Sequence, residues 1–253
     1  MRIPEPEDLP EEGAVLYVVG TPLGHLGDIS VRALSVLSQV DALACEDTRR
    51  TWKLLSHYEI PRPSIFFACN DHNERKVVSR VLGLLDAGHK VGLVSDAGMP
   101  LVSDPGFVIA RAAREAGHAV VIVPGPTAAV TGLLHSGLPV HAFCFKGFAP
   151  RKSGQRQRFI ATDRDNPATL IFYASPYRVG KLMADALAVL GDRPAALCAE
   201  LTKKFEQIHR APLSALIEQF GSKPPQGELT LLIHGYDRRL TPLPDDDEDS
   251  AAL

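Results

Sequence analysis

The sequence of 253 residues contains only four cysteines, which lie at least 24 residues apart and form no CxxC or Cys/His cluster. This spacing argues against a disulfide framework and is typical of reduced, buried thiols. HxH, HExxH and carboxylate–histidine arrays are also missing, so we expect no bound metal. The first twelve residues contain no apolar run. We therefore expect no signal peptide and a cytoplasmic location.

Long apolar runs are scarce as well. The longest uncharged stretch, residues 116–145, reaches membrane-spanning length, but seven glycines and prolines interrupt it. A lipid-exposed helix is not built from such a sequence, so we expect no membrane segment. The stretch is instead a candidate for a buried helix or for an apolar contact between two copies of the chain.

Neither acidic nor basic residues are in large excess, since the formal net charge is −3. The charge is unevenly distributed: residues 1–12 carry −4 and residues 245–253 carry −5, which leaves +6 on the rest of the chain. We expect the acidic ends, 1–12 and 241–253, to be solvated tails. A basic surface on the body is compatible with this distribution.

The first part of the body alternates short β-rich segments with segments of helical periodicity. This rhythm predicts an α/β domain with a mainly parallel, doubly wound sheet. Ser30 is a candidate helix cap, and Gly88 and Gly117 are candidate helix stops. We expect strands at 14–20, 42–45, 64–68, 91–95 and 119–123, and helices at 30–38, 48–58, 73–87 and 107–116.

The second part has a different pattern, in which some strands follow one another without a helix between them. This predicts a second α/β domain with a mixed sheet, and we place the boundary near 138–142, with domains at 13–139 and 140–240. The expected strands are 143–147, 169–174, 195–200, 205–210 and 228–234, and the expected helices are 178–190 and 213–220.

Loops rich in small residues follow four strands of the first domain, and such loops meet at the carboxyl edge of a parallel sheet. They contain the segments GTPLG, EDTRR, SDAGMPLVSDPG and PGPTA. Glycine lets backbone approach a flat ligand, and a carboxylate can accept from ribose hydroxyls. The four loops together indicate a nucleoside-type ligand. A dinucleotide is an alternative, because Glu46 lies where a ribose-binding acid is expected, although the glycines read GxxxGxxG.

A basic segment runs from Lys146 to Arg158, with five cations and no acid before Asp163. It is either a solvated face or a site for a phosphate-rich partner. Arg49 and Arg50 present the same choice, since they can bind phosphate or form ion pairs with neighbouring carboxylates.

Taken with their order and spacing, these loops resemble the ribosomal RNA small-subunit methyltransferase I family, a branch of the tetrapyrrole methylases. The resemblance covers about residues 14–235. The matching segments are LYVVGTPLGHLGDI, ACEDTRRT, NDHNE, VSDAGMPLVSDPG, VPGPTAA, GFAPRK, SPYR and AELTK.

The resemblance implies two α/β domains with S-adenosylmethionine in the cleft between them, usually in a homodimer. It implies methylation of the ribose 2′-hydroxyl of a cytidine in the decoding region of 16S ribosomal RNA, on naked RNA or on the small ribosomal subunit. Carried over position by position, the cofactor contacts are Thr21, Pro22, Asp96, Ala97, Gly98, Met99, Thr127, Ala128, Phe172, Tyr173, Ala174, Glu200, Leu201 and Thr202.

The sequence departs from the family pattern at several of these segments. The family commonly reads SDAGTP and ESPHR, where this chain has Met99 and Ala174, so that a carboxylate is missing at position 174. Gly20, His25 and the NDHNE segment depart from PTPIGNL and HEHNE.

Methyl transfer to a ribose hydroxyl requires positioning and a base that removes the hydroxyl proton. The loop residues that we consider as the base are Asp47, His72 and Asp104, and Lys152 is a candidate for stabilising the alkoxide. The candidate RNA contacts are Arg49, Arg50, Arg151, Lys152 and Arg156. The alternatives are a porphyrinoid methyltransferase, a nicotinamide-dependent oxidoreductase and a non-catalytic ribosomal RNA-binding module.

Overall fold

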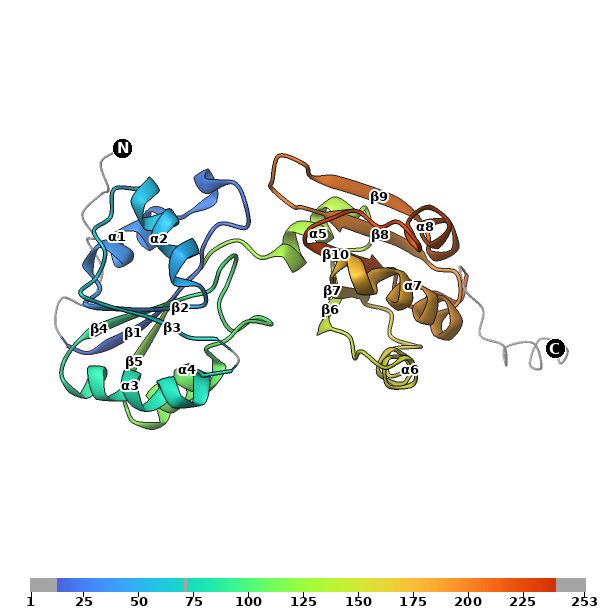
Figure 1. The fold of residues 1–253 in the computed structure, drawn as a ribbon. Helices are drawn as coiled ribbons and strands as arrows, with labels where there is room; N and C mark the ends of the chain where they lie inside the picture. The colour runs from blue at the N-terminus through green and yellow to red at the C-terminus, as the bar shows by residue number, and fades with distance from the viewer. Residues whose placement is uncertain (1–12, 71, 240–253) are drawn as a thin grey trace, which may run out of the picture. The chain divides into compact units, whose positions relative to one another are not determined.

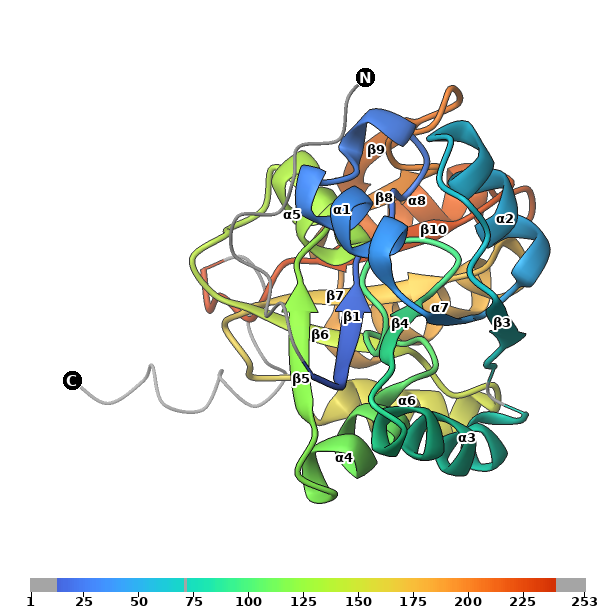
Figure 2. The same cartoon turned by 90° about the vertical axis from the view of Figure 1, so that its left-hand side faces the viewer.

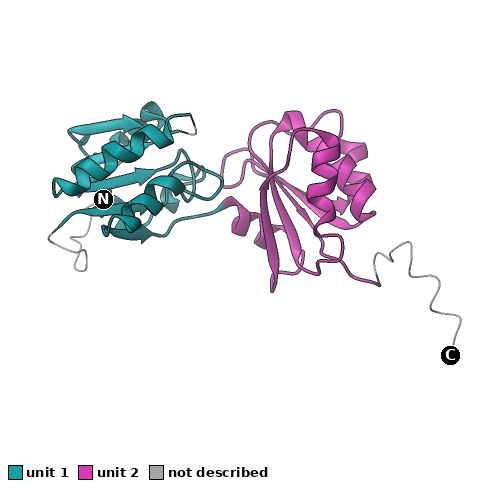
Figure 3. Ribbon diagram, turned by 90° about the horizontal axis from the view of Figure 1, so that it is seen from below, with its two compact units in different colours: residues 1–127 teal, residues 128–253 magenta. Residues whose placement is uncertain are grey.

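The computed structural model describes residues 13–70 and 72–239. The acidic tails expected at 1–12 and 241–253 lie outside the described residues. The chain divides into two compact units, residues 1–127 and 128–253 (Figure 3). Each unit contains one five-stranded sheet with its own core.

The sheet of the first unit is entirely parallel, with strand order β3-β2-β4-β1-β5. Helices α1 and α2 cover one face, and α3 and α4 cover the other (Figure 1). Figure 2 shows β1 beside β5 with their arrowheads at the same end. The elements are β1 (Val15–Val19), a 3-10 helix (Leu26–Asp28), α1 (Val31–Gln39), β2 (Ala42–Cys45), α2 (Thr48–His57), β3 (Ile65–Ala68), α3 (Glu74–Asp86), β4 (Lys90–Val94), α4 (Phe107–Glu115) and β5 (Ala119–Val123).

Burial on both faces explains why the central strands are continuously apolar. All residues of β1 and β2 are buried, as expected for a parallel sheet covered by helices on both sides. Ser30 caps α1, because its hydroxyl accepts a hydrogen bond from the Ala33 N–H at 3.0 Å. The expected parallel, doubly wound sheet is therefore confirmed.

The crossovers diverge between two neighbouring strands of this sheet. From β1 the chain passes to α1 on one face, whereas from β4 it passes to α4 on the opposite face. Since β1 and β4 pair directly, this is the point where a doubly wound sheet opens for a ligand.

The sheet of the second unit is mixed, with strand order β6-β7-β10-β8-β9 and one parallel pair, β6 with β7. Helices α6, α7 and α8 pack on one face, and α5 packs on the other. The elements are α5 (Ala128–Ser136), β6 (Phe143–Phe148), α6 (Ser153–Ala161), β7 (Thr169–Ala174), α7 (Pro176–Leu190), β8 (Pro194–Ala199), β9 (Gln207–Pro212), α8 (Leu213–Phe220) and β10 (Leu229–Ile233).

Helices α5 and α6 were not predicted from the sequence. Ala129 and Leu133 of α5 pack against Ile171, Ala196 and other residues of the second sheet. This helix therefore belongs to the second unit, and the division falls at 127/128 rather than near 138–142.

No helix in the described part of the chain combines the length and apolarity that a membrane span needs.

Candidate functional site

Three loops of the first unit are joined at the carboxyl edge of the sheet. Thr21 and Gly98 exchange backbone hydrogen bonds of 2.8 and 3.0 Å, and the Gly20 N–H donates to the Val123 carbonyl at 3.0 Å. A Cβ added to Gly20 would lie 2.7 Å from the Gly125 Cα, so only glycine permits this approach. The loops after β1, β4 and β5 therefore form one continuous surface of backbone.

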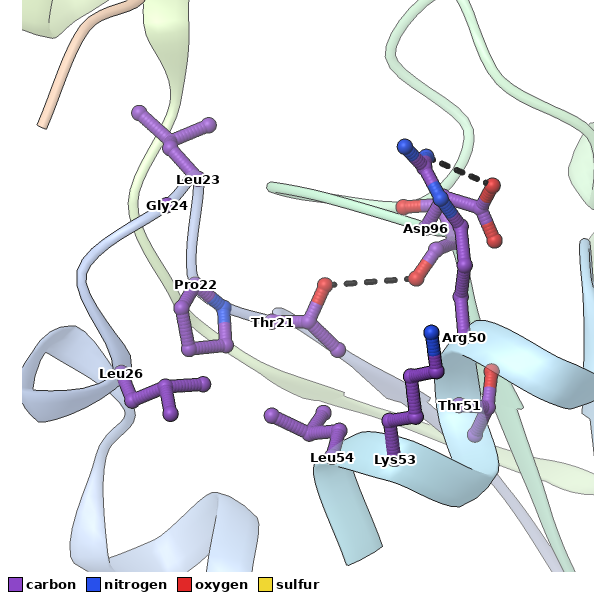
Figure 4. Close-up of a pocket in the computed structure, with 11 residues that line it drawn as sticks. Thr21, Pro22, Leu23, Gly24, Leu26, Arg50, Thr51, Lys53, Leu54 and Asp96 are labelled. Carbon is purple, nitrogen blue, oxygen red and sulfur yellow. Dashed lines mark hydrogen bonds and ion pairs between the residues drawn. The ribbon is translucent and has the colours of Figure 1, made fainter. Parts of the chain in front are cut away.

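A pocket of about 250 Å³ opens beside this surface (Figure 4). Loop residues form one side and the α2 helix forms the other. Its wall combines apolar side chains with a carboxylate, two cations and hydroxyls. The lining residues are Thr21, Pro22, Leu23, Gly24, Leu26, Arg50, Thr51, Lys53, Leu54, Ser95 and Asp96.

Asp96 is the central carboxylate of the pocket. Its Oδ1 accepts a hydrogen bond from the Asp47 N–H at 3.0 Å, and its Oδ2 lies 3.0 Å from Arg50 Nη1 (Figure 4). Glu46 Oε2 in turn accepts from the Asp96 N–H at 3.3 Å. Backbone and cation together orient Asp96 at the rim of the pocket, where it can accept from a ligand hydroxyl.

Asp47 is the N-cap of α2, and its carboxylate accepts hydrogen bonds from Arg49. It accepts from the Arg49 side chain at 2.7 and 3.1 Å and from the Arg49 N–H at 2.8 Å. These bonds hold the pKa of Asp47 well below the ordinary value of an aspartate. A carboxylate that is so strongly stabilised as the ion is a weak base.

Thr51 adds a polar group to the pocket wall. The residue is 4% exposed, and its hydroxyl has no oxygen or nitrogen partner among the described residues. The thiol of Cys45 is its neighbour, and burial raises the pKa of that thiol to about 11. A buried hydroxyl, a rim carboxylate and apolar side walls suit the polar and flat parts of a nucleoside.

Of the predicted cofactor residues, Thr21, Pro22 and Asp96 line this pocket. Ala97 and Gly98 continue the same loop. The Met99 side chain packs behind it, with its sulfur 3.1 Å from the Gly125 nitrogen. Thr127 ends the β5 loop and Ala128 begins α5.

The other candidate bases do not line the pocket. His72 is exposed, and its N–H donates to the Asn70 side-chain oxygen at 3.1 Å. Asp104 is half-buried in the β4–α4 loop, next to Ser103, whose φ is +67°. Neither residue is therefore among those that line the pocket with Thr21 and Asp96.

In the second unit, the predicted cofactor residues lie at the ends of two strands. Phe172, Tyr173 and Ala174 end β7, and the Tyr173 hydroxyl accepts from the Ala129 N–H at 3.2 Å. Residues 200–202 follow β8, with φ values of +51° at Glu200 and +64° at Thr202. Strain of this kind in residues other than glycine is typical of functional loops.

Glu200 is firmly held within that loop. It accepts from Lys203 Nζ and from the Glu228 N–H, both at 2.9 Å. Burial acts to raise its pKa, but the backbone donor and the ammonium outweigh burial and lower it. Glu200 is therefore an ionised part of the loop at neutral pH.

The structure corrects the expectation that Arg156 contacts RNA. Arg156 is 5% exposed, and its Nη2 lies 2.6 Å from the Asp185 carboxylate. Lys146 is likewise paired with Asp163. Arg151 and Lys152 are exposed, so only these two of the three predicted contacts in this segment are accessible to a phosphate.

Sequence reasoning missed the part of α2 that lines the pocket. Lys53 and Leu54 lie three and four residues after Arg50, which places all three on one side of a helix. That spacing was available in the sequence as a signal. Lys53 is exposed and makes no ion pair with a described residue.

Among the alternatives, comparison with known proteins favours a methyltransferase. The family model described as Tetrapyrrole (Corrin/Porphyrin) Methylases matches residues 15–217. The ribosomal RNA small subunit methyltransferase I of Vibrio cholerae is 45% identical over 90% of this chain and 80% of its own length. The protein of the same name from Thermotoga maritima is 40% identical over 87% of this chain and 98% of its own length.

The chain belongs to the ribosomal RNA small subunit methyltransferase I family of tetrapyrrole methylases. It is thus a methyltransferase, and the dinucleotide alternative loses its basis.

Solved structures agree with the fold of this family. Diphthine synthase superposes with a TM-score of 0.67 at 17% identity, covering 87% of this chain and 90% of its own. At that identity the likeness concerns the fold alone.

No group of three or more His, Cys, Asp or Glu side chains that could hold a metal ion occurs among the described residues.

Proposed function

We propose that this methyltransferase uses S-adenosylmethionine to methylate the ribose 2′-hydroxyl of a cytidine in the decoding region of 16S ribosomal RNA. The observation that carries the proposal is the 39–45% identity, over most of the chain, to relatives named ribosomal RNA small subunit methyltransferase I. The strand-edge pocket, with its rim carboxylate and cations, supports it.

In this proposal the first unit holds the cofactor with Thr21, Pro22, residues 96–99 and Thr127. Asp96 accepts from ribose hydroxyls, and the glycine-rich backbone lies against the flat base. Ala128, residues 172–174 and residues 200–202 are the contributions of the second unit. Bound S-adenosylmethionine supplies an electrophilic methyl carbon.

The protein's part in the reaction is to align the ribose hydroxyl and to accept its proton. Because Arg49 hydrogen-bonds to the Asp47 carboxylate and lowers its pKa, we assign Asp47 a structural role as the cap of α2. His72 and Asp104 stay candidates for the base. Lys152 is exposed and available to stabilise the developing alkoxide.

The RNA contacts that we propose are Arg49, Arg50, Arg151 and Lys152, all of them exposed.

We also propose a cytoplasmic homodimer. Five exposed apolar side chains of the uncharged stretch support a contact between copies, with Leu134 71% exposed: Ile122, Val130, Leu134, Val140 and Phe143. A single species near 27 kDa in sedimentation would reject the dimer.

The test is transfer of tritiated methyl groups from S-adenosylmethionine to small ribosomal subunits that lack the modification, followed by mapping of the labelled nucleotide. We expect one 2′-O-methylcytidine per subunit, in the decoding region. Label on a base, or transfer to a porphyrinoid with none to RNA, would overturn the proposal. Comparing assembled subunits with naked 16S RNA identifies the substrate form.

A further inference from the structure

Arg156 is the centre of a buried polar cluster in the second unit. Its Nη1 donates to the carbonyls of Pro150 and Arg151 at 3.1 and 2.9 Å, while its Nη2 pairs with Asp185. Asp185 also accepts from Ser153 Oγ at 2.9 Å and from Gln157 Nε2 at 2.9 Å. One guanidinium therefore ties the loop between β6 and α6 to the α7 helix.

This cluster decides which charges of the basic segment reach the surface. Asp185 is neutralised by Arg156, and Asp163 is neutralised by Lys146. Arg151 and Lys152 are exposed and form no ion pair with a described carboxylate. The surface of the loop is therefore cationic.

The first turn of α7 adjoins this loop. Arg178 lines a small pocket together with Pro150, Arg156 and Ser175. Arg178 is exposed and, within the described chain, has no carboxylate partner. Its neighbour Tyr177 is 90% exposed, which is unusual for an aromatic side chain.

We propose that Arg151, Lys152, Tyr177 and Arg178 form one surface that binds single-stranded RNA of the substrate. The three cations contact phosphates, and Tyr177 stacks on an unpaired base. Exposed cations together with an exposed aromatic ring are the combination that binds single strands. This inference rests on the proposed function and adds Tyr177 and Arg178 to it.

Arg156 acts in this proposal as a positioning residue. It does not touch the RNA, but it holds the carbonyls of Pro150 and Arg151 and so fixes where the side chains of Arg151 and Lys152 emerge. Without it, the loop keeps its charge and loses its fixed position.

The first test measures binding of a labelled single-stranded oligoribonucleotide of decoding-region sequence at several salt concentrations. Replacing Arg151, Lys152 and Arg178 together with Gln should make the slope of log K against log salt shallower by about 2, at about 0.7 per contact. Tyr177→Ala should weaken binding by about fivefold to a hundredfold, the effect of one lost base stack. The matched control, Lys223→Gln, changes an exposed cation of the same unit and should behave as wild type.

The second test examines Arg156 through Arg156→Leu combined with Asp185→Leu, which removes both buried charges and leaves neither unpaired. We expect unchanged affinity for S-adenosylmethionine, weaker RNA binding, and faster tryptic cleavage after Arg151 and Lys152. Unchanged RNA affinity together with unchanged cleavage would contradict the positioning role.

The outcomes separate this inference from the proposed function. If wild type methylates the small subunit but the Gln variants and Tyr177→Ala bind RNA as wild type does, the surface is wrong and the function stands. If wild type transfers no methyl group to RNA while the variants still lose affinity, the proposed function fails and the surface stands. Equal loss of affinity in Lys223→Gln would show a general charge effect and overturn the surface.

Discussion

In the first unit, the cations near the strand ends are exposed and pair with loop carboxylates, Arg49 with Asp47 and Arg50 with Asp96. In the second unit, the best-paired cation of the basic segment is buried, and its exposed neighbours Arg151 and Lys152 form no ion pair with a carboxylate that the structure describes. The same residue type thus orders a pocket rim in one unit and fastens a loop in the other. The role of a cation depends on its burial and on its ion-pair partners. Neither can be read from a run of charged residues in the sequence.

The largest effect should come from breaking the buried pair on one side. Arg156→Ala leaves Asp185 as an uncompensated buried charge, and we expect a loss of about 3–5 kcal/mol in the free energy of unfolding. The double Leu variant should recover most of this loss. Hydrogen exchange of the amides of β7 and α7 measures the effect in the second unit. The single tryptophan, Trp52, lies in the first unit and should report little of it.

If Arg156→Ala is as stable as wild type, the pair is not a structural element of the second unit. The comparison between the units would then lose its basis.

Acidic pH should also destabilise the second unit more than the first. In Asp185, burial raises the pKa, but hydrogen bonds from Gln157 and Ser153 and the charge of Arg156 outweigh it, so that the folded pKa is lowered. The stability contributed by ionised Asp185 is therefore fully present above the ordinary aspartate pKa of about 3.9 and is lost as the pH falls below it. Asp163 behaves similarly.

We expect protection of the amides in β7 and α7 to fall below about pH 4 in wild type. The double Leu variant should show a smaller fall, because one of the two carboxylates is gone. Equal acid sensitivity in both proteins would assign the loss to other groups.

The smallest effect should come from Arg49→Gln. The Arg49 side chain is exposed, so its ion pair with Asp47 should contribute little, and thermal unfolding should remain as in wild type. If Arg49 contacts a phosphate, the salt slope of RNA binding should become shallower by less than one unit. An unchanged slope would restrict Arg49 to capping α2 through Asp47.

Local signals were sufficient for most of the first unit. The strands 42–45 and 119–123 were predicted with the observed bounds, and Ser30 was predicted as the cap of α1. These features depend on apolar runs and on neighbouring residues. The meeting of the loops followed from the parallel sheet, because parallel strands end at one edge.

Features that depend on distant contacts were not predictable in the same way. The α6 sequence, SGQRQRFIA, contains few apolar residues, and its buried face includes Arg156, whose partner Asp185 is 29 residues away. Helix α5 follows directly on PGPT, and it is recognised as part of the second unit only by its packing on β8 and β10. A boundary drawn from composition could not include such contacts.

Calorimetric titration of Asp96→Asn with S-adenosylmethionine tests most directly whether the strand-edge pocket of the first unit holds the cofactor. Asn keeps the shape of Asp96, but it replaces one of the two acceptor oxygens with an NH2 donor and removes the negative charge that strengthens hydrogen bonds from ribose hydroxyls. We predict affinity about ten- to a hundredfold weaker than wild type, the effect of one hydrogen bond to a charged group. The control, Asp86→Asn, removes an exposed carboxylate of α3 and should bind as wild type does. Unchanged affinity in Asp96→Asn would contradict the assignment of this pocket.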